Sequence, residues 1–338
     1  MEGFTSNFTV DSFVVPAAWG LGLALYASLS VAFLVWMERK VSADIQARWG
    51  PMHHGFHGWW QTLADTVKLI FKEDIVPAKS DKWIFLAAPF LVFVPALLAF
   101  LVIPMGDGLV ARNMDVGLVY YLAVPSLATI GIISAGWSSA SKYSTIGGLR
   151  SAAQLISYEV PRAMSVLGVV MLAGTLSTVG IVDAQKRIWF FLPQILGFLV
   201  YYIASIAEVG RTPFDLPEAE SELVNGYFTE YSGLRWSIFM MGEYVALLAA
   251  CFMGAVLFLG GWRAPFGIFP QLGPLWLILK TYALVYVAMW IRWTLPRYRI
   301  DQLLEISWKV LLPLSLVNVA WTAVLVFAGG EWLKGLLG

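Results

Sequence analysis

The sequence predicts an all-α integral membrane protein with eight transmembrane helices and with amphipathic and acidic helical loops on the cytoplasmic side. Three observations lead to this fold class. Hydrophobic residues make up 59% of the 338 residues and charged residues only 13%, whereas soluble domains are about 25% charged. The mean hydropathy is +0.72. The apolar residues also form long runs, without the alternation that a membrane β-barrel requires.

Eight apolar runs are long enough to cross a bilayer, whose hydrocarbon core of about 30 Å requires about 20 helical residues. We expect them to form a single membrane domain over residues 1–338. The segment before the first run carries Glu2 and Asp11 but no Lys or Arg, so it lacks the basic region of a cleaved signal peptide and the first run should be retained. The expected spans are Pro16–Met37, Trp83–Ile103, Val116–Trp137, Val160–Ile181, Ile188–Ala207, Trp236–Leu259, Leu275–Trp293 and Val310–Phe327.

Positive charge is distributed unevenly between the connecting segments. Most Lys and Arg residues follow the first, third, fifth and seventh runs, whereas the other connections are short and hold few of them. Because Lys and Arg are enriched in cytoplasmic loops, we expect the odd-numbered connections to be cytoplasmic and both termini to face outward. A partner or a reaction is therefore expected on the cytoplasmic side.

Composition disfavours several function classes. The net charge is zero, which gives no indication of a nucleic-acid partner. The only cysteine, Cys251, cannot form a disulfide framework or a Cys-ligated iron–sulfur cluster within this chain. No phosphate-binding loop or zincin motif is present. His53, His54 and His57 lie among glycines that argue against a helix, so we expect neither a metal site nor a redox cofactor, and electron transfer must use partner proteins.

The first cytoplasmic segment contains an expected amphipathic helix over Trp59–Lys72. Apolar residues recur on one face and polar residues on the other, and such a helix lies in the membrane interface. It is either a membrane-surface anchor or the wall of a cavity that Asp65 and Lys68 line. The apolar face holds Trp60, Leu63, Val67, Ile70 and Phe71, and the polar face holds Gln61, Asp65, Lys68 and Lys72.

The third cytoplasmic segment, over residues 208–230, is rich in acidic residues. A pattern that loosely matches a capping box begins at Asp215, so a short helix should run toward Tyr231 and end at Gly233. Neighbouring carboxylates raise one another's pKa, and such a cluster can load and release protons near neutral pH. A solvated acidic helix is the alternative. Basic residues of the fourth segment, such as Arg297, are the expected partners.

Four ionisable residues fall within the expected spans, where a charge costs about 2.5–3.5 kcal/mol on insertion scales. Arg162 and Arg292 lie near cytoplasmic ends, where their side chains can extend to the membrane surface. Arg162 could instead form a local pair with Glu159. Glu243 and Lys280 lie deeper, and their axial positions differ by roughly 10 Å at a helical rise of about 1.5 Å per residue. We therefore expect no direct salt bridge and interpret both as points along a hydrated polar path.

Motifs along nearly the whole chain resemble those of one membrane-protein family. They are Met37 to Lys40, Leu63 to Lys68 with Lys72 to Asp74, Trp137 to Tyr143, Gly148 to Glu159, Ala207 to Arg211, the Pro213-Phe214-Asp215-Leu216 run with its following acids, Glu230 to Gly233, Leu279 to Thr281, Trp290 to Arg292 and Pro296 to Leu303. In these motifs the chain resembles the H subunits of bacterial respiratory complex I (NADH:quinone oxidoreductase), whose mitochondrial counterpart is NADH dehydrogenase subunit 1. The eight-span topology agrees with that family. The sequence departs at Pro51 to Gly55, where the family usually has an Asn-Arg-Val-Gly-like run, and this leaves the quinone type open.

The resemblance implies a function that composition does not. The family forms much of a quinone chamber that faces the iron–sulfur-bearing peripheral arm, and acidic residues lead from it toward antiporter-like subunits. By that likeness, quinone is a substrate, iron–sulfur clusters and flavin belong to partner subunits, and the chain lies in the bacterial inner membrane beside small membrane subunits. The implied chamber residues are Glu38, Arg39, Asp65, Lys68, Arg211 and Phe214. The implied proton path comprises Glu159, Glu208, Glu218, Glu220, Glu222, Glu243, Lys280 and Arg292.

Three other functions stay open at this point. The nearest is the equivalent subunit of a membrane-bound hydrogenase or of a complex fed by another electron donor. A stand-alone ion transporter is disfavoured because the polar sequence is concentrated on one side and no internal repeat is found. A structural anchor without chemistry would leave Glu243 and Lys280 unexplained.

Overall fold

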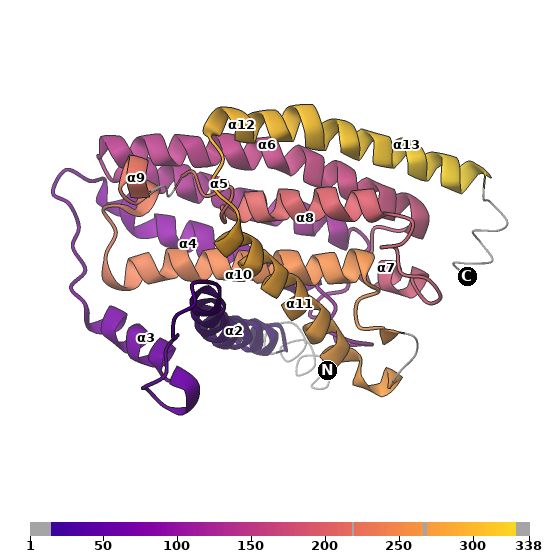
Figure 1. Cartoon of the computed structure of the whole chain (residues 1–338), viewed down its shortest axis with the longest axis horizontal. Coiled ribbons are helices and arrows are strands. Elements are labelled where there is room, and N and C mark those ends of the chain that lie inside the picture. The colour runs from indigo at the N-terminus through magenta and orange to yellow at the C-terminus, as the bar shows by residue number, and fades with distance from the viewer. Residues whose placement is uncertain (1–14, 218–219, 266–268, 329–338) are drawn as a thin grey trace, which may run out of the picture.

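A computed structural model describes residues 15–217, 220–265 and 269–328, and all regular elements in these ranges are helices (Figure 1). Seven of the described helices are long and apolar enough to cross a membrane, and α8 is a shorter apolar helix. The long helical segments are α2 (Val15–Ile45), α4 (Lys82–Leu98) with the 3-10 turn Ala99–Val102, α5 (Gly117–Ser138), α6 (Lys142–Ala173), α8 (Ile195–Val209), α10 (Gly233–Phe258), α11 (Gly273–Thr294), and α12 (Ile300–Glu305) continued by a π-helical turn (Ile306–Leu311) and α13 (Leu312–Ala328). The expected all-α membrane fold is therefore confirmed.

Short helices occupy the connections between the spans. The amphipathic helix α3 (Gln61–Phe71) confirms the helix expected over residues 59–72. Near the opposite end of the bundle, α7 (Thr178–Ala184) begins at Ser177, whose hydroxyl accepts a hydrogen bond from the Gly180 N–H. Among its described residues, the acidic segment holds the single turn α9 (Glu220–Leu223) and a 3-10 turn (Gly226–Phe228).

Several predicted spans have different bounds in the structure. The first helix continues beyond Met37 to Ile45, and the last described helical segment begins at Ile300 rather than Val310. The span expected over 160–181 is part of a helix that begins at Lys142, because polar residues before Glu159 continue the helix beyond the apolar run; it ends at Gly174, which has a φ of 66°. The span expected over 188–207 begins only at Ile195. Pro193 explains the late start, since a residue before proline is disfavoured in helical conformation.

The acidic segment does not form the single helix expected to end at Gly233. After α9 the chain turns at Val224 and Gly226, which both have positive φ. Gly233 is the first residue of α10 rather than a helix stop. A residue with positive φ leaves the right-handed helical region, so Val224 interrupts the helix that the spacing of the acidic residues had suggested.

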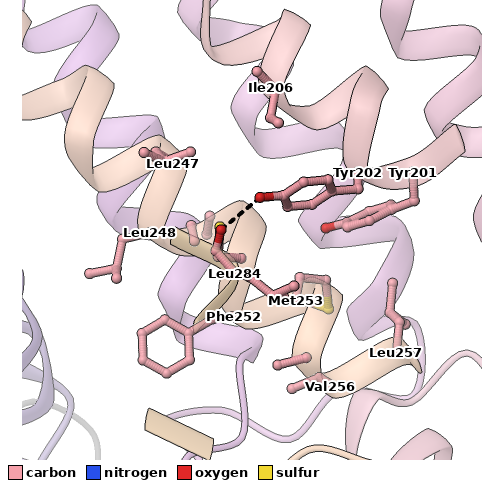
Figure 2. Packing of buried hydrophobic residues seen from close by; sticks show 14 of the residues in the cluster. Tyr201, Tyr202, Ile206, Leu247, Leu248, Phe252, Met253, Val256, Leu257 and Leu284 are labelled. Carbon is pink, nitrogen blue, oxygen red and sulfur yellow. Dashed lines mark hydrogen bonds between the residues drawn. The ribbon is translucent and has the colours of Figure 1, made fainter. Parts of the chain in front are cut away.

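The long helix α10 passes through the middle of the bundle and is its most buried span. It packs against α4, α8 and α11, while α6 packs against α5, α8 and α13. Figure 2 shows the core between α8, α10 and α11, where Met253 and Leu257 of α10 lie on the side of Tyr201, and the Tyr202 hydroxyl of α8 donates to the Leu284 carbonyl of α11 at 2.6 Å. Such close packing is needed because lipid provides no hydrophobic drive for helix association.

Buried polar side chains also join the helices within this apolar core. Gln194, just before α8, donates from its amide Nε2 to the Thr322 hydroxyl of α13 at 2.6 Å and accepts from Asn318 Nδ2 at 2.7 Å. All three residues are buried. Adjacent glycines of α6 and α8 provide the space, because a Cβ at Gly168 would lie 2.6 Å from Gln194 Oε1. This cluster, Gln194–Asn318–Thr322, fixes α13 against α6 and α8.

Candidate functional site

A cavity of about 480 Å³ lies between α2, α3, α10 and the end of α11. Its walls are mainly apolar, and Leu29 of α2 and Leu63 of α3, both among the lining residues, are also exposed on the protein surface. The polar lining residues include Glu38, Arg39 and Asp65. The cavity therefore combines an apolar body with a small group of ionisable side chains, which is the usual composition of a site for a largely apolar small molecule.

The α3 side of the cavity carries an ion pair. Arg39 Nη1 lies 2.6 Å from Asp65 Oδ2, and Gln61 Nε2 donates to Asp65 Oδ1 at 3.3 Å. Partial burial raises the pKa of the Asp65 carboxyl, but the hydrogen bond and charge of Arg39, with Gln61, outweigh it and hold that pKa below its usual value. Lys68 lies 3.7 Å from Asp65, yet its side chain is 68% exposed and is not among the lining residues.

The buried Glu38 carboxylate is a junction of three contacts. Arg292 Nη1 lies 2.6 Å from Glu38 Oε1, and the Tyr244 hydroxyl donates to Glu38 Oε2 at 2.8 Å. Arg211 Nη1 lies 3.5 Å from Glu38 Oε2, while Arg211 Nε lies 2.6 Å from Glu243 Oε1. The Arg211 guanidinium also lies 4.0 Å from the centre of the Tyr244 ring. Glu38, Arg211 and Glu243 thus form a continuous chain of charge that leads inward from the cavity.

A second cavity, of about 80 Å³, lies among α4, α5, α6, α8 and α10. Glu243, Arg162 and Glu208 all line it. Arg162 of α6 and Glu208 of α8 form an ion pair, and the side chain of Arg162 is only 3% exposed. Its walls are mainly apolar, but these three ionisable side chains provide polar partners for water in a cavity of this size. Arg211 therefore joins a lining residue of the larger cavity, Glu38, to a lining residue of the second cavity, Glu243.

The pairing of Arg162 corrects two expectations. Its side chain does not extend to the membrane surface, and its ion-pair partner is Glu208 of a different helix rather than the nearby Glu159. The reason is packing: α6 and α8 lie against each other, and burial without a paired charge would be very costly. Arg292, by contrast, is near the end of α11 and pairs with Glu38.

The other predicted site residues lie outside the two cavities. Phe214 is buried between the rings of Tyr158 and Tyr298, at centroid distances of 5.5 and 5.7 Å. The Lys280 ammonium donates to the backbone carbonyls of Leu259, Gly261 and Arg263 at 2.6 to 3.0 Å. Glu243 and Lys280 thus have separate partners, as expected.

The acidic segment contributes less to the cavities than its composition suggested. Glu222 pairs with Arg150 of α6 at 2.6 Å on the surface. Arg297 lies 3.1 Å from Asp215, which confirms the expected charged contact between the fourth and third segments. Glu218 lies outside the described residues, as does the side chain of Glu220.

Comparison with known proteins identifies the family of this chain. The model of the NADH dehydrogenase family matches residues 20–323. The chain belongs to this family. It is 50% identical over 312 residues to the H subunit of the NADH-quinone oxidoreductase of Geobacillus kaustophilus (strain HTA426), covering 90% of this chain and 93% of that protein. It is 48% identical over 322 residues to the protein of the same name from Bacillus cereus (strain B4264), with 92% and 96% covered. The family resemblance inferred from the motifs is thus confirmed.

Tyr244, which contacts both Glu38 and Arg211, was not identified from the sequence as a site residue. Tyr244 lines the larger cavity, donates to Glu38 and lies beneath the Arg211 guanidinium. A tyrosine in an apolar run is usually a packing residue. The only sequence feature that could have indicated a functional role was its position directly after Glu243. Its role depends on a contact between α2 and α10 that joins residues far apart in the sequence.

Proposed function

We propose that this chain is a membrane subunit of a proton-translocating NADH:quinone oxidoreductase, which supplies part of the quinone chamber and links quinone reduction to proton movement. One observation carries the proposal: the ionisable end of a largely apolar cavity continues, through Glu38 and Arg211, into buried carboxylates at a second cavity. The names of the bacterial relatives support the reaction and the multisubunit setting.

The chemistry of the larger cavity suits a quinone. An isoprenoid tail is apolar and can reach the cavity from lipid past Leu29 and Leu63. The quinone carbonyl oxygens are acceptors, and Arg39 supplies N–H donors in the cavity. Reduction to the quinol consumes two electrons and two protons. The electrons come from NADH through the flavin and iron–sulfur clusters of partner subunits, which form the peripheral arm.

The coupling step is electrostatic. A negative charge that develops on the quinone during reduction alters the balance at Glu38, whose carboxylate is held by Arg292, Arg211 and Tyr244. Because Arg211 also holds Glu243, a change at Glu38 changes the affinity of Glu243 for a proton. Glu243 faces the second cavity with Glu208, so protons move from this pair toward neighbouring antiporter-like subunits. The acidic segment that includes Glu222 adds further negative charge near the start of this proton path.

The remaining predicted residues have supporting places in this scheme. Glu159 continues the path on α6 beyond Arg162. Lys280 lies toward the other end of the bundle, where three carbonyls hold its ammonium. Phe214 and Lys68 shape the surroundings of the chamber rather than its wall. In this scheme the cavity and the acidic segment face the cytoplasm of a bacterial cell, and both termini face outward.

The Glu208→Gln variant tests the proposal. The amide oxygen of glutamine can still accept a hydrogen bond from Arg162, so the complex should assemble, whereas the side chain can no longer carry a proton. We expect NADH-driven quinone reduction and proton pumping by the purified, reconstituted complex to fall by about tenfold or more. The matched control is Glu305→Gln, which removes an exposed carboxylate paired with Lys309 and should leave both rates unchanged. Full coupled pumping by Glu208→Gln would contradict the assignment.

A further inference from the structure

A second surface cleft of about 480 Å³ lies beside the candidate quinone cavity and shares one residue with it. The cleft is formed by the C-terminal end of α2, the loop after it, and the start of α3. Arg39 lines both spaces, so a ligand in the cleft would lie next to the Arg39–Asp65 ion pair. The complete set of lining residues is Arg39, Arg48, Trp49, Gly50, Pro51 and Gln61.

The cleft is positively charged. Asp65 neutralises Arg39, but Arg48 has no ion-pair partner among the described residues and donates from Nε to Gln46 Oε1 at 2.6 Å. Lys40 adds charge at the edge, because a Cβ at Gly50 would lie 3.1 Å from the Lys40 Cδ. The guanidinium of Arg48 presents several N–H donors in a plane, a geometry that suits the oxygens of a phosphate group.

The cleft also lies at the depth where a bilayer meets water. The first part of α2 is apolar and carries exposed leucines, among them Leu25, and the polar residues begin near its C-terminal end. One lining residue of the cleft is aromatic: Trp49 is 85% exposed, and Phe56 of the same loop is 84% exposed. Exposed aromatic rings together with arginine are typical of the membrane–water interface. Apolar side chains of α3, such as Leu63 and Val67, are also exposed.

We propose that this cleft binds the phosphate-bearing headgroup of an anionic phospholipid, with Arg48 as its main contact. The charge selects an anionic headgroup, and the surrounding aromatic and apolar side chains receive the acyl region. The adjoining cavity shares Arg39 with the cleft, so the bound lipid lies beside that cavity. The assignment rests on the charge and depth of the cleft and does not require the proposed quinone function.

Photoactivatable phosphatidylglycerol and phosphatidylcholine, incorporated separately into bilayers that hold the purified complex, test the proposal. Peptides covering residues 46–61 are then examined by mass spectrometry for attached lipid. In the native protein we expect phosphatidylglycerol to label these peptides about fivefold more than phosphatidylcholine, since one cationic contact near the surface changes binding by about that factor. Arg48→Gln should bring the ratio close to one.

The matched control is Lys72→Gln, which removes one positive charge from the same interfacial segment but outside the cleft, and which should keep the native ratio. Equal labelling of the native protein by the two lipids would overturn the proposal. The same ratio in Arg48→Gln and Lys72→Gln would overturn it too, because the preference would then be a general effect of charge. Loss of labelling in excess inorganic phosphate would indicate a site for a free anion, and no labelling by either lipid would indicate that protein covers the cleft; both results would overturn the lipid assignment.

Discussion

Replacement of Glu208 by leucine should strongly destabilise the chain, because it removes one partner of a largely buried ion pair. Leucine has a similar size but no oxygen to accept from Arg162. The Arg162 guanidinium would remain charged and buried, with its side chain only 3% exposed. Removal of one partner from such a pair costs about 3–5 kcal/mol, and burial here leaves little solvent screening to reduce that cost. We therefore expect a loss of about 3 kcal/mol or more.

Removal of both charges should be much less harmful. In the double variant Arg162→Met with Glu208→Leu, apolar side chains of similar size replace both partners, and no isolated charge remains. Substitution of a complete buried pair by apolar groups is often neutral or stabilising. The double variant should therefore lie within about 1 kcal/mol of the native protein. The cost of the double variant should therefore be far below the sum of the costs of Glu208→Leu and Arg162→Met made separately.

The chain contains its own reporter for this experiment. Cys251 is the only cysteine and is buried in α10, so a thiol-reactive probe modifies it only when the helices around it separate. The extent of modification is measured against temperature, with the Cys251 peptide quantified by mass spectrometry. We expect the Glu208→Leu variant to react at the lowest temperature and the double variant near the native one. If the single variant matches the native protein, or if the double variant is the less stable, the argument from an isolated buried charge is wrong.

Two further predictions concern local packing and pH. Gly147→Ala should cost about 1–3 kcal/mol, since its Cβ would lie 2.9 Å from the backbone of Gly226; the matched Gly22→Ala meets nothing within 4 Å and should be neutral in the same thermal assay. The pKa of Asp65 is lowered in the folded chain, so its pairing with Arg39 stabilises α3 above the ordinary carboxyl pKa of about 3.9 and is lost as pH falls through the lowered value. Hydrogen-exchange protection of residues 61–71 should decrease there, and Asp65→Asn should abolish that pH dependence; equal profiles in the two proteins would contradict this reasoning.

The sequence allowed most spans to be predicted because hydropathy measures the property that a bilayer selects. The errors lie where a helix continues into water. The helix α6 begins at Lys142 because nothing in the polar segment before Glu159 breaks it, yet polar residues carry no hydropathy signal. The reverse error occurred before Ile195, where an apolar segment is held in turns by side-chain contacts, such as that of Gln185 with the Phe190 N–H.

The candidate site was predictable in its residue types but not in its pairings. Family motifs identified Glu38 and Asp65, and the cost of burying charge identified Glu243. Their partners depend on which helices meet: Arg211 reaches Glu243 only because the end of α8 lies against α10. Spacing along one helix instead favoured a local partner for Arg162. Contacts between distant segments follow from the packed bundle, so a single sequence contains no direct signal for them.

The Gln194–Asn318–Thr322 cluster has a consequence for how the chain is built during synthesis. When α13 enters the bilayer, the earlier helices have already been made, and its largely apolar surface offers few features that define one seating position. A slip by one helical turn would place Asn318 about 5.4 Å from its present level and separate its amide from Gln194, its hydrogen-bond partner. The polar cluster therefore favours a single register of α13. In any other register the loss comes mainly from buried amides without hydrogen-bond partners rather than from lost apolar contact.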